Sequence, residues 1–267
     1  MDNASLIIVV FNRSVDNVPA IKAAITTSVR PEIIVCDNST EEYCNQAMCE
    51  ALGVCYVDMA GNKGLAAAYQ AGIERCHGSL VCLFDDDTEV DQDYFTALED
   101  LDASSPDWDV ALPLVMSGDS VLSPCTFDGF RAHSFPSIES VSDCSELSGI
   151  NSGMIVKRSV FEAVSYDSGL FLDLVDHKFI DDAKKAGMKV IYFRGPLLEQ
   201  SYSLTTDNFD KALNRLAIFE RDARHFYSGS APRRLYCIGM LAVRKIKLCL
   251  KFQTIRFLIP AKDDRKA

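Results

Sequence analysis

The sequence contains no uninterrupted run of eighteen apolar residues, so it does not predict a membrane-spanning helix. It also lacks any Cys-x-x-Cys pair, although it has 10 cysteines. Several of these fall inside apolar strand patterns, where a free thiol behaves as a small core side chain. Unpaired cysteines, and a first strand that begins almost at once without a signal peptide, predict a cytoplasmic protein with reduced thiols.

Basic residues are in the minority, with 27 Lys and Arg against 38 Asp and Glu. The net charge of −11 argues against the nucleic-acid-binding class, which carries basic patches. The charge is unevenly spread along the chain. Residues 233–267 have a net charge of +8, so residues 1–232 must have a net charge of −19 to give the total of −11. An acidic body with a basic tail predicts two partners of different kinds.

Three common ligand-binding motifs are missing as well. Residues 61–69 read Gly-Asn-Lys-Gly-Leu-Ala-Ala-Ala-Tyr, without the lysine-threonine ending of a Walker loop or the glycine spacing of a dinucleotide fingerprint. The loop that follows Asp85 lacks the glycine and glutamate of an EF-hand. Residues 61–69 therefore favour either a helix N-terminus that faces an anion or a ring, or close packing of a helix on a sheet.

Short apolar runs alternate with helical patterns over the first hundred residues. The runs 5–11, 32–36, 54–57 and 79–84 predict buried strands with helices between them. This alternation is typical of an α/β fold with a mostly parallel, Rossmann-like sheet flanked by helices. Residues 117–148 are polar and bear proline and glycine, and they predict a long loop near the site.

Three consecutive aspartates, Asp85, Asp86 and Asp87, follow the strand predicted over 79–84. In an open α/β sheet, ligands bind outside the carboxyl ends of the strands. Adjacent carboxylates repel unless a cation lies among them, and Mg²⁺ or Mn²⁺ binds carboxylate oxygens while keeping positions open for phosphate. The alternative is an acidic turn in which Asp87 caps the following helix.

A second candidate carboxylate is Asp176, which shares a helical stripe with Leu172, Phe179, Ile180 and Ala183. A carboxylate among apolar side chains is poorly solvated, which suits a general base. In the alternative interpretation Asp173 caps the helix and Asp176 favours its dipole. His177 is predicted to be a surface histidine rather than a ligand.

The basic tail, residues 231–267, has an amphipathic helical pattern. Its apolar stripe is Leu235, Ala242, Val243, Ile246, Leu250 and Phe257, with Arg244, Lys247 and Lys251 on the other face. Such a helix can lie in a membrane interface and bind anionic headgroups. The alternative is a helix packed on the preceding domain, residues 1–230, or on a second subunit of a homo-oligomer.

Six short motifs together resemble glycosyltransferase family 2, of the GT-A fold, and its bacterial rhamnosyltransferase-like members. The resemblance runs from Ser5 to about Tyr227, and its motifs are residues 10–13, 36–39, 62–68, 85–87, 151–153 and 171–176. It implies a catalytic domain over 1–230 that uses a UDP- or dTDP-sugar with Mg²⁺ or Mn²⁺. The acceptor would be a glycan, polyprenyl-linked, in surface polysaccharide or lipopolysaccharide synthesis at the inner face of the cell membrane.

The resemblance also assigns roles to individual residues. Asp176 would be the general base of an inverting transfer, and Asp85 with Asp87 would form a DxD-like metal site. The nucleotide would contact Phe11, Asn12, Arg13, Asp37, Asn62, Gly64, Asp85 and Asp86. The acceptor would contact Asn151, Ser152, Gly153 and Asp173.

One position departs from the family pattern. Many relatives carry a metal-binding histidine about two dozen residues after the base, whereas this chain has Glu199 and Gln200 there. Metal dependence is therefore less firmly implied than the fold. The alternatives in function are a sugar-nucleotide pyrophosphorylase, whose usual glycine-rich opening loop is missing at residues 10–14, and a non-catalytic carbohydrate-binding protein.

Overall fold

The computed structural model describes residues 3–28, 30–101, 103–200 and 208–259. The chain forms two compact units. The first comprises Met1–Ser168 and Val175–Tyr202, and the second Gly169–Leu174 and Ser203–Ala267. The domain boundary expected at residue 230 falls inside the second unit, between its two long helices.

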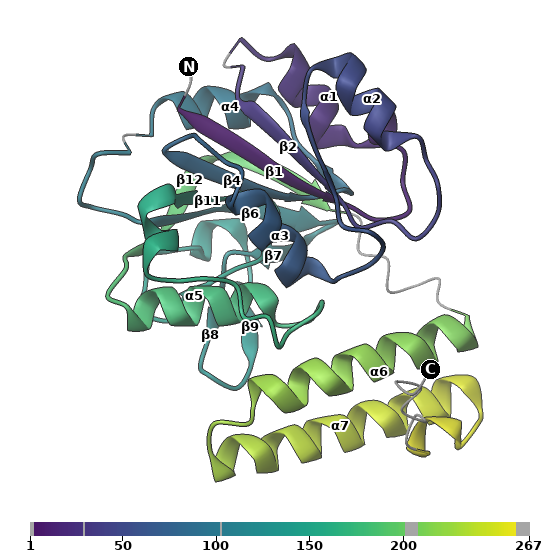
Figure 1. Ribbon diagram of the computed structural model, residues 1–267. Helices are drawn as coiled ribbons and strands as arrows, with labels where there is room; N and C mark the ends of the chain where they lie inside the picture. Colours follow the sequence, from purple (N-terminus) through teal and green to yellow (C-terminus); the bar gives the residue numbers. More distant parts are fainter. Residues whose placement is uncertain (1–2, 29, 102, 201–207, 260–267) are drawn as a thin grey trace. The chain divides into compact units, whose positions relative to one another are not determined.

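The first unit is built on a nine-stranded sheet (Figure 1) with the order β3-β2-β1-β4-β11-β6-β12-β5, in which β7 pairs with β6. The strands are β1 Ala4–Val10, β2 Glu32–Asp37, β3 Cys55–Asp58, β4 Leu80–Asp85, β5 Thr88–Glu89, β6 Val110–Ser117, β7 Ser120–Ser123, β11 Met154–Lys157 and β12 Val190–Gln200. Strands β3, β2, β1 and β4 pair in parallel, which confirms the predicted α/β class. Strand β11 runs antiparallel to both β4 and β6, so the sheet is mixed beyond β4.

Helices lie between the strands of the first unit along the chain, and the first three of them join the parallel strands β1, β2, β3 and β4. They are α1 Pro19–Thr26, α2 Asn45–Leu52, α3 Leu65–Ile73, α4 Gln92–Glu99 and α5 Val175–Lys185. Every residue of β1 is buried, as expected of a central strand covered on both faces. Helix α3 lies so close to β1 that a Cβ on Gly72 would be 2.4 Å from Cγ2 of Ile7. Helix α4 is capped by Asp91, so the alternative that Asp87 caps this helix is wrong.

The segment 117–148 is folded, and the prediction of a long loop there was wrong. Besides β7 it contains β8 Cys125–Phe127, β9 Ala132–Ser134 and β10 Leu147–Ser148. These last three form a small antiparallel sheet in the order β10-β8-β9. Strands of two to three residues are too short for an alternating apolar pattern, which is why the sequence did not reveal them.

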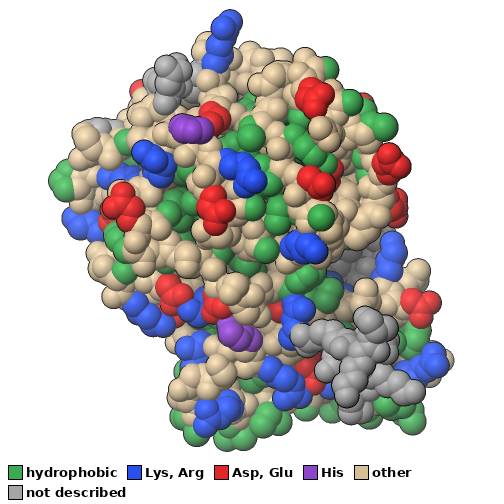
Figure 2. Space-filling model, in the orientation of Figure 1, with side chains coloured by type: hydrophobic (Ala, Val, Ile, Leu, Met, Phe, Trp, Pro, Cys, Tyr) green, Lys and Arg blue, Asp and Glu red, His purple; other side chains and the backbone are tan. Residues whose placement is uncertain are grey.

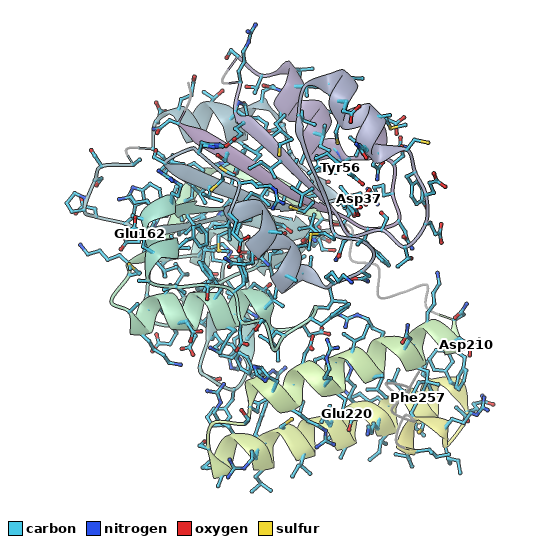
Figure 3. The ribbon with its side chains drawn as sticks, viewed as in Figure 1. Asp37, Tyr56, Glu162, Asp210, Glu220 and Phe257 are labelled. Carbon is cyan, nitrogen blue, oxygen red and sulfur yellow. The ribbon has the colours of Figure 1, made fainter. Side chains whose placement is uncertain are left out.

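The second unit contains α6 Phe209–Phe226, α7 Ala231–Phe252 and the short 3-10 helix η5 Arg256–Leu258. Phe257 is 1% exposed and packs with Ala212 and Leu216 of α6. Glu220 of α6 pairs with Lys245 of α7 at 2.6 Å; Figure 3 labels Glu220 and Phe257. Helix α7 is thus tied to α6 by both packing and charge.

The structure corrects part of the stripe predicted for the tail, residues 231–267. Phe257 is buried against α6 rather than placed on an open apolar face. Arg244, expected on the polar face, lies 3.8 Å above the ring of Phe219. Within the described part of the chain, none of the helices has the length and apolarity that crossing a membrane requires. Residues 260–267 of the predicted tail lie outside the described residues.

Candidate active site

Asp85 ends β4 and is the best-enclosed carboxylate of the aspartate triplet. Tyr69 of α3 donates a hydrogen bond to Oδ1 of Asp85 at 2.7 Å, and Ser152 donates to Oδ2 at 3.3 Å. Burial raises the pKa of Asp85 to about 6, against the opposing effect of the Tyr69 hydrogen bond. The charges of Asp87 and Asp176 raise this pKa further. Tyr69, which the sequence did not single out, is fully buried and holds this carboxylate in place.

Asp86 points in another direction and ties the end of β4 to the end of β1. Its Oδ2 accepts the backbone N–H of Phe11 at 2.8 Å, and the Arg13 side chain donates to its backbone oxygen at 2.7 Å. Burial raises the pKa of Asp86, while the Phe11 N–H and the charge of Arg13 lower it. Phe11 is left 46% exposed, so its ring is available to a ligand.

Asp87 and Asp85 share one partner, the side-chain amide of Gln200 at the end of β12. Nε2 of Gln200 lies 3.1 Å from Oδ1 of Asp87 and 3.5 Å from Oδ2 of Asp85. Glu199 instead pairs along the sheet edge with Glu89 of β5. Of Glu199 and Gln200, it is therefore Gln200 whose side chain reaches the aspartates.

The donor set around Gln200 fits a hard divalent cation. The carboxylates of Asp85 and Asp87 converge on the Gln200 amide, and rotation of that amide group would direct its oxygen toward them. Across the described residues, no group of three or more His, Cys, Asp and Glu side chains is placed to hold a metal ion. A cation here would therefore complete its coordination with substrate oxygens or water.

Asp37, at the end of β2, is embedded in a hydrogen-bond network. Its Oδ2 accepts from Asn45 at 2.9 Å and from the hydroxyl of Tyr56 at 3.1 Å, and Figure 3 labels Asp37 and Tyr56. Its Oδ1 accepts the backbone N–H of Ser39 at 3.1 Å. Burial raises the pKa of Tyr56 well above its usual value, and the charge of Asp37 raises it further, so the hydroxyl stays protonated and donates to Asp37. Asp37 is thus fixed in orientation and 8% exposed.

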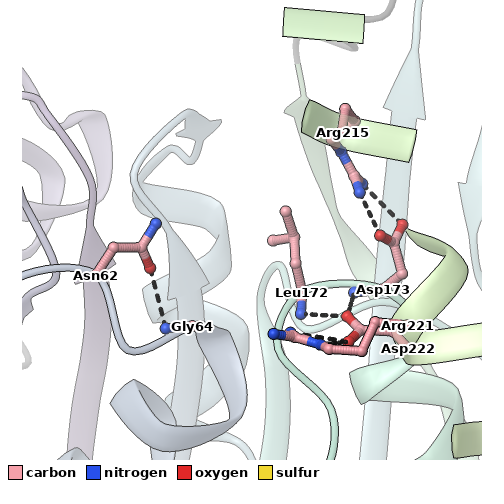
Figure 4. A network of polar contacts seen from close by, with 7 residues as sticks. All are labelled: Asn62, Gly64, Leu172, Asp173, Arg215, Arg221 and Asp222. Atoms are coloured by element: carbon pink, nitrogen blue, oxygen red, sulfur yellow. Dashed lines mark hydrogen bonds and ion pairs between the residues drawn. The ribbon is translucent and has the colours of Figure 1, made fainter. Parts of the chain in front are cut away.

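Asn12 and the 62–64 turn complete the rim beside Asp37. Asn12 adopts a left-handed conformation, and its Oδ1 accepts the backbone N–H of Thr40 at 2.8 Å. In the turn, Asn62 Oδ1 accepts the N–H of Gly64 at 3.0 Å (Figure 4), and Asn38 accepts the N–H of Lys63 at 2.7 Å. The backbone N–H groups of Lys63 and Gly64 are therefore both bonded to side-chain amide oxygens.

Asn151, Ser152 and Gly153 form a tight turn into β11. Gly153 has φ +75°, and a Cβ on it would be 2.6 Å from Cδ2 of Leu198. Asn151 accepts the hydroxyl of Tyr166 at 2.7 Å, and Ser152 is fully buried between Asp85 and Gln200. The predicted acceptor-binding turn therefore lies beside the aspartate triplet.

Asp176 lies in the first turn of α5 and is half-buried. Its charge acts on Asp85, on Tyr69 and Tyr166, and on Cys125, and raises the pKa of each. Contacts link the two sites as well, because Tyr166 stacks on Phe179 of α5 with ring centroids 4.7 Å apart and on Tyr69, the partner of Asp85, at 5.5 Å. The base candidate and the aspartate triplet therefore share one region of the first unit. The two carboxylates that the sequence singled out separately are brought together.

Asp173 belongs to the second unit, where both of its oxygens are occupied by Arg215 of α6 (Figure 4). The fully buried Asp222 accepts the backbone N–H groups of Leu172 and Asp173 at 2.8 and 2.9 Å. Arg221 neutralises the other Asp222 oxygen at 3.0 Å. Asp173 does not cap α5, which begins at Val175. Neither Arg215 nor Asp222 could be singled out from the sequence, because their role depends on contacts with residues 42 to 50 positions away.

Solved structures with a similar fold include several sugar transferases. GalNAc-T7 with UDP, GalNAc and Mn²⁺ has a TM-score of 0.60 and 15% identity over 96% of this chain and 55% of that one. PcManGT, a mannosyltransferase from Pyrobaculum calidifontis in complex with GDP-Man and Mn²⁺, has a TM-score of 0.59 and 11% identity over 95% and 73%. TarS of S. aureus has a TM-score of 0.51 and 11% identity over 86% and 44%.

These likenesses confirm the GT-A fold. The chain spans about half the length of the GalNAc-T7 and TarS chains. No match was found among curated proteins. The family model described as Glycosyl transferase family 2 matches residues 5–162, more than half of the sequence. This chain belongs to glycosyl transferase family 2.

Proposed function

We propose that this protein is an inverting glycosyltransferase that uses a UDP- or dTDP-sugar as donor and a hydroxyl of a glycan as acceptor. The observation that carries the proposal is a chain of contacts from the helix of Asp176 to Asp85 at the end of β4. Phe179 of α5 stacks on Tyr166, Tyr166 stacks on Tyr69, and Tyr69 donates its hydroxyl to Asp85. A donor's diphosphate fits beside the aspartate triplet, and an acceptor hydroxyl fits beside a carboxylate that can take its proton. The family match supports a transferase over a pyrophosphorylase.

In the proposed reaction, Asp176 accepts the proton of the acceptor hydroxyl as that oxygen attacks the anomeric carbon. The bond from this carbon to the diphosphate oxygen breaks on the opposite face, so the configuration inverts and the nucleoside diphosphate leaves. Asp85, Asp87 and Gln200 would hold Mg²⁺ or Mn²⁺, which neutralises charge on the leaving diphosphate when bound. Asp37 and the exposed ring of Phe11 would bind the nucleoside.

The proposal includes an acceptor on a lipid carrier and a protein that binds the inner face of the cell membrane. Helix α7 leaves Leu235, Ile238, Val243, Ile246 and Leu250 more than half exposed, with values from 52% to 74%. Residues 231–259 contain seven Lys and Arg and no Asp or Glu. Figure 2 shows hydrophobic and basic side chains together on the surface of this unit. An apolar face flanked by positive charge suits the surface of an anionic bilayer. It suits a second copy of the same helix less well, because the two positive helices would repel each other.

A donor panel tests the central proposal. The purified protein is mixed with UDP-, dTDP- and GDP-sugars, with and without Mn²⁺, and both thermal stabilisation and donor hydrolysis are measured. We expect one UDP- or dTDP-sugar to stabilise the fold and to be hydrolysed slowly. Asp176→Asn should keep donor binding and lose transfer by orders of magnitude. Binding of sugars without turnover of any donor would identify a non-catalytic protein instead.

A further inference from the structure

The histidine beside the proposed base, which we expected to be a surface histidine rather than a ligand, is half-buried and has defined contacts. His177 is half-buried and directly follows Asp176, whose Oδ1 accepts the backbone N–H of His177 at 2.8 Å. Nδ1 of His177 lies 2.8 Å from Oγ of Ser148, a residue of β10 that is 2% exposed. The imidazole therefore has one nitrogen bonded to the small antiparallel sheet.

The same ring is fixed by an aromatic contact from the neighbouring strand. Phe127 of β8 stacks on the imidazole with ring centroids 4.9 Å apart and an interplanar angle of 10°. Strand β8 also approaches the base, because the charge of Asp176 raises the pKa of Cys125. Two strands of the small sheet thus set the orientation of His177, and the sheet and the base lie in one region.

The second nitrogen of this ring is unused. Nε2 of His177 has no hydrogen-bond partner among the residues that the structure describes, and it is not one of their buried unpaired atoms, so it is accessible to a ligand. A half-buried imidazole with one nitrogen anchored and the other open can donate to or accept from a hydroxyl. The chemical partner that fits is a second hydroxyl on the molecule whose first hydroxyl is bound by Asp176.

We propose that His177 is an acceptor-binding residue whose Nε2 bonds a hydroxyl next to the reacting one, so that the enzyme selects a sugar ring as its acceptor. Ser148 and Phe127 are positioning residues for this ring. The inference rests on the proposed transferase function and extends it to the recognition of the acceptor. Donor binding does not involve His177.

The test uses octyl glycosides of common hexoses as acceptor probes, with water as the reference acceptor. His177→Asn keeps a polar atom at the Nδ1 position and removes Nε2, whereas His177→Gln restores a polar atom near Nε2. We expect His177→Asn to raise the acceptor KM about tenfold and His177→Gln to recover part of that loss. The donor Kd and the rate of donor hydrolysis should stay unchanged in both variants.

A deoxy acceptor gives a second readout that a loss of structure would not reproduce. The deoxy analogue lacking the neighbouring hydroxyl should be a poorer acceptor than its parent for the wild type, and an equally good one for His177→Asn. His133→Asn is the matched control, since His133 of β9 is exposed and pairs with Asp128 at 3.1 Å. An unchanged acceptor KM in His177→Asn, or a wild type that glycosylates none of the probes while hydrolysing its donor, would overturn the inference. Failure of donor hydrolysis in the wild type would instead overturn the proposed function.

Discussion

The side-chain amide of Gln200 lies 3.1 Å from Oδ1 of Asp87 and joins the last residue of β12 to the aspartate triplet. Because Nε2 of Gln200 also reaches Asp85, an uncharged donor occupies the point where the two carboxylates converge. The amide donates to both carboxylates and so relieves their repulsion. This contact decides how strongly the site can attract a cation.

Gln200→Glu should strengthen Mn²⁺ binding, because it replaces the amide with a third carboxylate. We expect the Mn²⁺ Kd to fall about tenfold at neutral pH, measured by calorimetry without nucleotide. Glu199→Gln is the matched control, since the neighbouring residue of the strand faces away from Asp85 and should leave the Kd unchanged. An unchanged Kd in Gln200→Glu would show that the cation does not bind at Asp85 and Asp87.

Asp85→Asn should make the fold more stable at neutral pH while it abolishes donor turnover. The pKa of Asp85 is raised from 3.8 to about 6, so its proton is held more tightly in the folded than in the unfolded state. The stabilising effect of the neutral carboxyl is complete below pH 4 and is lost as the pH rises through 6. This corresponds to about 3 kcal/mol between those limits.

Urea denaturation in EDTA, from pH 4 to pH 7.5, measures this effect. Asp85→Asn should gain stability over the wild type progressively from about pH 4 to pH 6 and keep a constant advantage above that, since its amide has no proton to lose. Asp119→Asn, at an exposed position before β7, should follow the wild type at every pH. A constant difference between Asp85→Asn and the wild type over this range would contradict the raised pKa.

Asp222→Asn should loosen the segment Gly169–Leu174 from α6. The substitution removes the charge that pairs with Arg221 and weakens the acceptor for two backbone N–H groups. We expect the free energy of unfolding to fall by about 1–3 kcal/mol, with faster amide exchange at Leu172 and Asp173. Asp210→Asn, on the exposed first turn of α6, should change neither quantity.

Substitutions on the open face of α7 test membrane binding better than truncation does. Deleting residues after Ser230 would remove Phe257 and Phe252, which pack on α6, and would expose new apolar surface. Leu235→Asp combined with Leu250→Asp should reduce sedimentation with phosphatidylglycerol vesicles at least tenfold. Leu52→Asp, at a 42% exposed position on α2, is the control. Equal sedimentation of all three proteins would contradict a lipid-facing role for α7.

The sequence by itself determined the parallel half of the sheet and the candidate carboxylates. Strands β1, β2 and β4 are continuous apolar runs, and burial on both faces leaves such runs few alternatives. Polar residues follow these strands directly, so the edge of the sheet that carries Asp37 and Asp85 could be predicted from chain order alone.

Only the tertiary structure decided what those residues contact. The contacts of the site join residues that are 16 to 115 positions apart in the sequence. They include the hydrogen bond from Tyr69 to Asp85, the hydrogen bonds from Gln200 to Asp85 and Asp87, and the placement of Asp176 near Asp85. The small β10-β8-β9 sheet and its contacts with His177 could not be predicted, because strands of two or three residues are too short to show a periodic pattern. Local patterns report which face of an element is buried, whereas partners across the fold depend on how distant elements pack.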